Sequence, residues 1–360
     1  MQTVLRPYHP ALNALGLIIM IFGLLMGFPL AVSAWVGDGA TLAYDQALFV
    51  TFVAGLLLWA TTRSERRDLR VHDGFLLVAL TWVVLPLFGA LPLLAYIPEL
   101  RFTDAYFEAV SGLTATGATV LTGLDDLPLS INLWRTFMHW VGGMGVIVLV
   151  VAILPLLGIG GRQLYKAEVP TPMKDSSLTP RIAETAKGLW MTYVLLTIAC
   201  GLSLWWAGLE GWDVVIHAFS IVGLGGFSNK DASLGHFANL NVEIVAIVFA
   251  LLAGLNYATH YLALMRRSTR PYARDPEIPF YFAVLAFSIL MLTVYLLAQG
   301  VDGRHAGRAG SGGRGRQHRH RRWLAGRQPG RRHPCLSPRS RHRLFYCRAS
   351  QDPQRAGHAL

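Results

Sequence analysis

The sequence has few of the residues on which enzymes and disulfide-stabilised proteins depend. Only three of its 360 residues are cysteine, at positions 200, 335 and 347, without the spacing of a disulfide framework or a zinc site. No Ser/His/Asp or Cys/His arrangement, phosphate-binding loop or cluster of metal ligands stands out. We therefore expect no enzyme activity, no cofactor bound by this chain and no transition-metal site.

Charge is also scarce over most of the chain. Charged residues make up 15% of the sequence, whereas 53% of the residues are hydrophobic. The first apolar run is long and lacks a small-residue cleavage site, so no cleavable signal peptide is expected. A helix needs about 20 apolar residues to cross a bilayer core of about 30 Å. Seven runs approach or reach this length, which predicts an all-α polytopic membrane protein: residues 11–32, 44–62, 74–97, 133–158, 188–208, 241–265 and 279–299.

The net charge of +11 is a property of the C-terminal segment. Residues 301–360 hold 15 Arg, two Asp and no Lys, which gives +13, whereas the preceding 300 residues have 17 basic and 19 acidic side chains, which gives −2. Three interpretations are open: GC-rich DNA read in the wrong frame, a polybasic tail that binds anionic lipid or nucleic acid, and a distinct short paralogue. We favour the first, and expect a disordered segment that binds no nucleic acid.

The basic residues of the remaining chain lie in alternate loops. Thirteen of the 17 follow the second apolar run, join the fourth run to the fifth, or precede the seventh. The positive-inside rule places these loops in the cytoplasm. We therefore expect two shorter apolar segments, near 103–113 and 212–222, to enter the membrane from the outer side.

These two short segments belong to a stretch that occurs twice, 109 positions apart. Each copy predicts a helix too short to span the bilayer, followed by a loop of small residues. Loop backbone at membrane depth must be buried in protein or line a wet cavity, so two such hairpins predict a pore. Surface hairpins and simple helix-packing elements are the alternatives. Four pairs of identical residues align without a gap: Asp104/Asp213, Ala109/Ala218, Ser111/Ser220 and Gly117/Gly226.

The hairpins have the chemistry of a monovalent-cation filter. Asp104 and Asp213 stand where the N-caps of the short helices are expected. The C-terminal end of such a helix carries about half a negative charge, which favours a cation beyond it. Small loop residues allow backbone carbonyls to approach one axis and replace the ion's hydration shell. Neither loop has a ring of carboxylates, which argues against a divalent-cation filter.

Other polar or small residues near the hairpins have simpler explanations. Trp134, Arg135 and His139 open the fourth span, where interfacial anchoring is the expected role. Glu108 and His217 occupy equivalent positions in the two short helices, and packing or a water contact explains both as well as a chemical role does. The run Gly-Gly-Met-Gly at 142–145 predicts a close contact through small residues.

Several of these segments resemble a known family. Residues 111–121 (SGLTATGATVL) look like the first selectivity-filter hairpin of the Trk-type potassium uptake proteins, and 140–147 (WVGGMGVI) resemble the helix that follows it. Residues 154–170 and 178–187, in a cytoplasmic loop, point to the Trk-H branch rather than the Ktr-B or HKT branches. The second filter at 225–228 (GGFS) also fits, so the resemblance covers roughly residues 10–300.

The resemblance implies a fold, a substrate and partners. Family members have an extra helix pair and four helix–pore-loop–helix repeats around one pore in the bacterial inner membrane. They are homodimers in membrane lipid, gated by a cytosolic NAD- and ATP-binding Trk regulatory subunit. Gly223 stands where Thr114 does, so one coordination level lacks a side-chain oxygen. Potassium, the substrate, is expected at ten filter positions: Thr114, Ala115, Thr116, Gly117, Ala118, Gly223, Leu224, Gly225, Gly226 and Phe227.

The resemblance also implies a division of the chain into six parts. These are an N-terminal helix pair, a first repeat, a cytoplasmic loop, a second repeat, the first helix of an incomplete third repeat, and the Arg/Gly-rich tail. Their expected bounds, in the same order, are residues 1–70, 71–160, 161–187, 188–267, 275–300 and 301–360.

The sequence departs from the family after residue 300. A third filter glycine is expected near position 320, where the sequence instead reads RGRQHRHRRWL (314–324). Two filter strands do not enclose a pore, and hairpin backbone exposed to lipid is costly. We therefore expect that this polypeptide does not transport potassium by itself. The alternatives are a non-conducting membrane protein that assembles with another chain, and an Arg-tailed membrane anchor.

Overall fold

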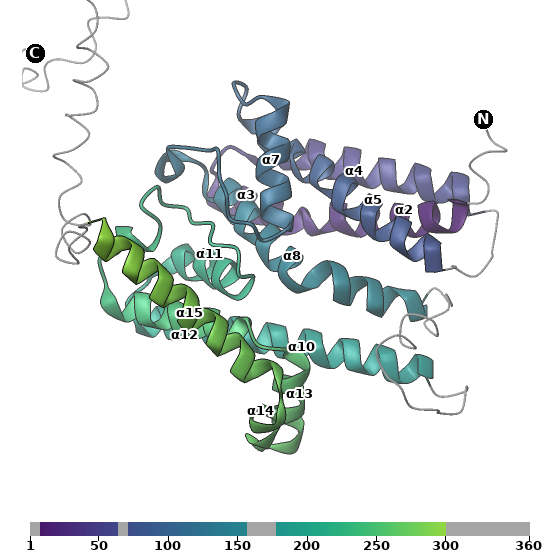
Figure 1. Cartoon of the computed structure of the whole chain (residues 1–360). Helices are drawn as coiled ribbons and strands as arrows, with labels where there is room; N and C mark the ends of the chain where they lie inside the picture. The colour runs from purple at the N-terminus through teal and green to yellow at the C-terminus, as the bar shows by residue number, and fades with distance from the viewer. Residues whose placement is uncertain (1–7, 64–70, 157–177, 300–360) are drawn as a thin grey trace, which may run out of the picture. The chain divides into compact units, whose positions relative to one another are not determined.

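The computed structural model describes residues 8–63, 71–156 and 178–299, and within them the secondary structure is entirely helical (Figure 1). The tail at 301–360 and most of the predicted cytoplasmic loop at 161–187 lie outside the described residues. The helices are α2 (His9–Leu25), α3 (Gly27–Val36), α4 (Thr41–Thr62), α5 (Val71–Gly89), α6 (Leu91–Tyr96), α7 (Phe102–Leu113), η2 (Leu124–Asp126), α8 (Leu129–Leu156), α10 (Leu178–Trp206), α11 (Gly211–Val222), η3 (Ser233–His236), α12 (Leu240–Ala253), α13 (Tyr257–Arg266), α14 (Arg270–Arg274) and α15 (Glu277–Ala298).

Most of the predicted spans are confirmed. In the described part of the chain, five helical stretches are long and apolar enough to cross a membrane. A sixth predicted run, 133–158, corresponds to α8. The fold class is therefore that of an all-α polytopic membrane protein, as predicted. The five stretches are His9–Val36, Thr41–Thr62, Asp73–Tyr96, Lys187–Trp206 and Glu277–Ala298.

The predicted run at 241–265 is not one continuous helix, which corrects that prediction. α12 and α13 are bent by 93° at a break of three residues. Asn256 starts the second helix, because its side chain accepts a hydrogen bond from the Ala258 N–H at 2.9 Å. α12 and α13 together are as apolar as one membrane span. Hydropathy therefore does not reveal the N-cap, Asn256, at which the second helix begins.

The N-terminal helices α2 and α4 pack through glycine. A Cβ on Gly16 would lie 2.7 Å from the backbone nitrogen of Trp59, and one on Gly55 would lie 2.8 Å from the Gly16 oxygen. Both distances are shorter than real Cβ contacts, so only glycine allows this approach. Asn13 adds a hydrogen bond from its side-chain nitrogen to the Trp59 carbonyl oxygen at 2.9 Å.

The N-terminal helices also hold the start of α8. The Asp38 carboxylate, between α3 and α4, accepts hydrogen bonds from the Ser33 hydroxyl at 2.5 Å, the Ala40 N–H at 3.2 Å and the Ser130 N–H at 2.8 Å. Burial raises the pKa of Asp38, but these hydrogen bonds outweigh it and hold the pKa below its usual value. The carboxylate thus binds an N–H group in the first turn of α8.

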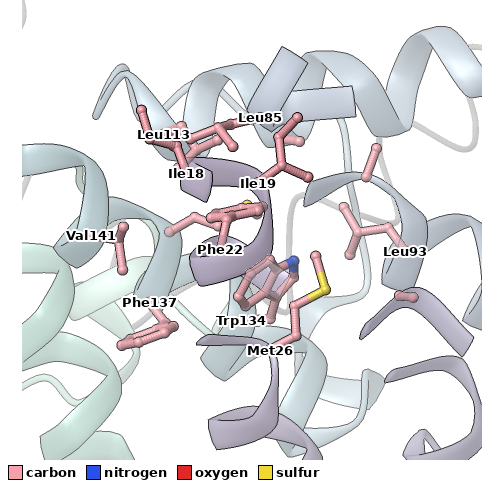
Figure 2. Close-up of a cluster of buried hydrophobic side chains, with 14 of the residues drawn as sticks. Ile18, Ile19, Phe22, Met26, Leu85, Leu93, Leu113, Trp134, Phe137 and Val141 are labelled. Atoms are coloured by element: carbon pink, nitrogen blue, oxygen red, sulfur yellow. The ribbon is translucent and has the colours of Figure 1, made fainter. Parts of the chain in front are cut away.

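One face of α8 is buried against the N-terminal helices (Figure 2). The fully buried Trp134 ring lies 5.5 Å from the Phe22 ring, and its indole N–H donates to the Gly89 carbonyl oxygen at 2.9 Å. Figure 2 shows Met26 beside this ring. The next residue of α8, Arg135, contacts the two hairpins instead.

Candidate functional site

The two predicted hairpins have the same backbone conformation. α7 and α11 have 12 residues each, and their bounds are 109 positions apart, as in the sequence repeat. Left-handed backbone follows each helix at the same two places, Ala115 (φ 52°) and Gly117 (φ 74°) in the first hairpin, Leu224 (φ 56°) and Gly226 (φ 86°) in the second. The repeat in the sequence is therefore a repeat in the structure.

Hydrogen bonds at the end of each short helix also recur. In both hairpins three consecutive N–H groups bond back to the last turn of the helix, which reverses the chain immediately after the helix ends. The first hairpin has Thr114 N to Val110 O (2.9 Å), Ala115 N to Gly112 O (3.2 Å) and Thr116 N to Ser111 O (3.0 Å), and the second has Gly223 N to Phe219 O (3.0 Å), Leu224 N to Ile221 O (3.1 Å) and Gly225 N to Ser220 O (3.0 Å).

The two loops meet at Gly117. A Cβ at this position would overlap the carbonyl oxygen of Gly225 and lie 3.1 Å from its carbonyl carbon. Gly226 has open space where a Cβ would lie, so only its positive φ requires glycine. Both signature glycines are therefore needed for their backbone conformation, and Gly117 is also needed for the contact between the loops.

Asp104 and Asp213 are not N-caps, which corrects that expectation. Arg101 and Glu210, in extended conformation, precede the helices, and the aspartates lie in the first turn. Asp213 instead accepts a hydrogen bond from the Asn229 side chain at 2.6 Å, which joins the start of α11 to the end of its loop. A carboxylate in the first turn is still favourable to the helix dipole.

Each hairpin is closed by a direct hydrogen bond from the middle of its helix. Glu108 accepts from the Thr119 hydroxyl at 2.9 Å, and His217 contacts the Ser228 hydroxyl at 3.0 Å. Both pairs are equivalent in the repeat. His217 Nδ1 lies 2.7 Å from the Asp213 carbonyl oxygen, which only accepts. In the neutral ring Nδ1 therefore carries the hydrogen, and Nε2 accepts from Ser228.

Trp134, Arg135 and His139 are not interfacial anchors, because all three side chains are fully buried. Arg135 forms an ion pair with Glu108 at 2.7 Å, and its guanidinium lies 4.4 Å from the centre of the Phe227 ring. The His139 ring lies 4.0 Å from the same ring, and a Cβ on Gly225 would overlap it. The sequence feature that indicates a buried Arg135 is its acidic partner, Glu108, in the short helix before α8.

The predicted close contact at the glycine run is confirmed, and the structure locates it. A Cβ on Gly142 would overlap the carbonyl oxygen of Leu113, at the C-terminal end of α7. A Cβ on the next residue, Gly143, would lie 2.9 Å from the Cα of Gly223, which follows α11. Two adjacent glycines of α8 thus bring the ends of both short helices against one helix.

Comparison with known proteins identifies this arrangement. Residues 42–300 match the TrkH family, described as a cation transport protein. The chain belongs to the TrkH family. It is therefore a multi-pass membrane protein of a transporter family, as the resemblance of its filter segments predicts.

Individual relatives agree with the family assignment. The Trk system potassium uptake protein TrkH of Escherichia coli K12 is 46% identical over 282 residues, which cover 78% of this chain and 58% of the relative. TrkG of the same strain is 39% identical over 281 residues, with the same coverage of 78% and 58%. The crystal structure of the potassium transporter TrkH from Vibrio parahaemolyticus matches with a TM-score of 0.70 and 38% identity, over 83% of this chain and 62% of that chain. The chain thus spans less than two thirds of the length of these relatives.

Two sets of predictions stay predictions. The bounds of the six expected parts of the chain follow from the resemblance. The assignment of the ten filter positions as potassium ligands also follows from the resemblance.

Proposed function

We propose that the two hairpins contribute filter strands 114–118 and 223–227 to a path that passes potassium across the membrane. The observation that carries this proposal is the recurrence, 109 positions apart, of a 12-residue helix, a reversed chain and two left-handed residues. Backbone carbonyls presented by two equivalent loops are the ligands expected for a dehydrated monovalent cation.

The ends of the short helices support a cation as the substrate. Each C-terminal end carries about half a negative charge. Gly142 and Gly143 place both ends against the same helix, so the two dipoles act on neighbouring space. Thr114 adds a side-chain oxygen next to the first loop, 2.7 Å from the Thr116 hydroxyl, whereas Gly223 adds none at the equivalent position. Potassium is bound here as substrate and not as a cofactor.

The location and partners belong to the same proposal. The chain lies in the bacterial inner membrane with both hairpins on the outer side, because the basic loops lie in the cytoplasm. It forms a homodimer in membrane lipid and contacts a cytosolic NAD- and ATP-binding regulatory subunit, with no nucleic acid involved. Support comes from the relatives, which are named Trk system potassium uptake proteins, and from the basic residues around α14 (Arg270–Arg274).

A second candidate is assembly with another chain without conduction. It is favoured by α15, which is apolar and has no buried residue in the described part of the chain. Such a helix requires lipid or further protein around its whole surface. Copurification with a longer relative without conduction favours this candidate over the first.

Potassium uptake in an uptake-deficient E. coli strain tests the first proposal. Two proteins are compared: this chain, and a chimera in which residues 1–299 are followed by the remaining C-terminal part of E. coli TrkH. We expect the chimera to restore growth at low potassium and the chain alone not to do so. Gly117→Ala should lower uptake by the chimera at least about tenfold because of its backbone overlap. Full uptake by that variant would exclude this loop as a filter strand.

A further inference from the structure

Arg135 contacts both hairpins with one side chain. On the first hairpin its Nε donates to Glu108 at 2.8 Å, and its Nη2 donates to the Thr119 hydroxyl at 3.1 Å. On the second hairpin its Nη1 donates to the Ser228 carbonyl oxygen at 3.0 Å, and the guanidinium stacks over Phe227. Because the guanidinium is planar and rigid, it fixes the directions of all these bonds together.

Closing a hairpin does not require this ion pair. The second hairpin is closed by His217 and Ser228, without a cation at that point. Removing two charges from water is costly, and a buried pair is often no more stable than apolar residues of the same size. What the pair of Glu108 and Arg135 adds is the connection to the other hairpin, through the Ser228 carbonyl and the Phe227 ring.

The connection is specific to the junction between the first and second hairpins. The residues of α12 that lie 109 positions after Arg135 and His139 are Ile244 and Val248, which are 49% and 45% exposed. The repeat therefore preserves the filter backbone but does not repeat the arginine. Asp231 also crosses between the hairpins, to the Leu124 N–H at 3.0 Å, but it is exposed to solvent.

We propose that Arg135 is a positioning residue that sets the spacing of the two filter strands and thereby the preference for potassium over sodium. This inference rests on the proposed function. The strands touch where Gly117 meets Gly225, and Arg135 holds the chain just beyond that contact on both sides. Carbonyl ligands select an ion by their number and spacing, so a loosened second strand should admit the smaller ion more readily.

Hydrogen exchange on the purified full chain tests the positioning role. Arg135→Lys keeps the charge beside Glu108 but loses the planar fork, so we expect faster exchange in the second loop. The first loop keeps the hydrogen bonds of Glu108 to the Thr119 hydroxyl and the Val120 N–H, so its exchange should change less. The double variant Glu108→Gln with Arg135→Gln leaves no buried charge without a partner, and should have the same effect on the second loop. Asp231→Ala is the matched control, because it removes an exposed contact between the same hairpins. Unchanged exchange in the second loop of both Arg135 variants overturns the inference.

Ion uptake by the chimera tests the consequence for selectivity. We expect Arg135→Lys, which leaves the hydrogen bond of Glu108 to Thr119 in place, to lower the ratio of potassium to sodium uptake at least about fivefold, and the double variant to lower it at least as much. Asp231→Ala should leave that ratio within about twofold of the parent chimera. A parent chimera that takes up no potassium refutes the proposed function, whatever the exchange result. A double variant that keeps the parent ratio, or that stops transport while its second loop exchanges like the wild type, overturns the role of Arg135 alone.

Discussion

Replacing Gly142 by alanine tests how α8 fits against the first hairpin. In the interior of a helix, alanine is more favourable than glycine by about 1 kcal/mol, so helix propensity alone predicts a more stable protein. The structure predicts the opposite. A Cβ at Gly142 would overlap the Leu113 carbonyl oxygen and lie 2.7 Å from its carbonyl carbon, whereas ordinary contacts begin at 3.4 Å.

The expected loss in the free energy of unfolding depends on the atoms that must move to admit the new Cβ. The shortfall at the carbonyl carbon is about 0.7 Å (3.4 minus 2.7), and the obstructing atoms are backbone atoms at the end of α7. Inserting a group into a packed site typically costs about 1–3 kcal/mol, and a backbone obstacle belongs at the upper end of that range. Because the higher helix propensity of alanine offsets about 1 kcal/mol, we expect Gly142→Ala to lower the free energy of unfolding by about 1–2 kcal/mol.

Thermal unfolding of the purified, detergent-solubilised chain measures this loss. At about 2–4 °C per kcal/mol, the unfolding midpoint of Gly142→Ala should fall by several degrees. Gly201→Ala in α10 is the matched control, because a Cβ there would lie 3.6 Å from the Val214 side chain and 3.8 Å from that of Ala218. Its midpoint should stay the same or rise. If Gly142→Ala raised the midpoint as well, α8 would not lie against the end of α7 as described.

Three further predictions concern the N-terminal helices, the filter glycines and the tail. Because the pKa of folded Asp38 is lowered, the stability it contributes is complete above the unfolded-state pKa of about 3.9 and is lost as the pH falls through the lower folded value. The unfolding midpoints of wild type and Asp38→Asn should therefore differ at pH 7 and converge below about pH 3.9, and a difference that persists at low pH would contradict this. Gly226→Ala should lower the midpoint less than Gly117→Ala, because only φ opposes it; equal losses would argue against the contact between the loops. Translating the DNA that encodes residues 301–360 in its other two frames should reveal a third pore helix with a Thr/Ser-x-x-Gly filter, and its absence from both would favour a genuine basic tail.

The sequence by itself determined the class of the protein and the position of its hairpins. The length of an apolar run decides whether a helix spans a membrane, and that property is local to the run. The positive φ of Gly117 and Gly226 is equally local, because it depends on the backbone angles of one residue, whereas the contact of Gly117 with Gly225 is not. The repeat therefore locates the loops. The run at 142–145 indicates a close contact but does not identify its partner.

Only the tertiary structure decided which polar residues hold the hairpins together. Arg135 stands at the start of an apolar span. The neighbouring sequence is the same whether an arginine there lies at the membrane interface or is buried in the protein. What distinguishes the two is Glu108, a partner on another helix 27 residues away. A buried charge is stable only when its partners surround it, and those partners are brought together by folding and not by their order in the chain.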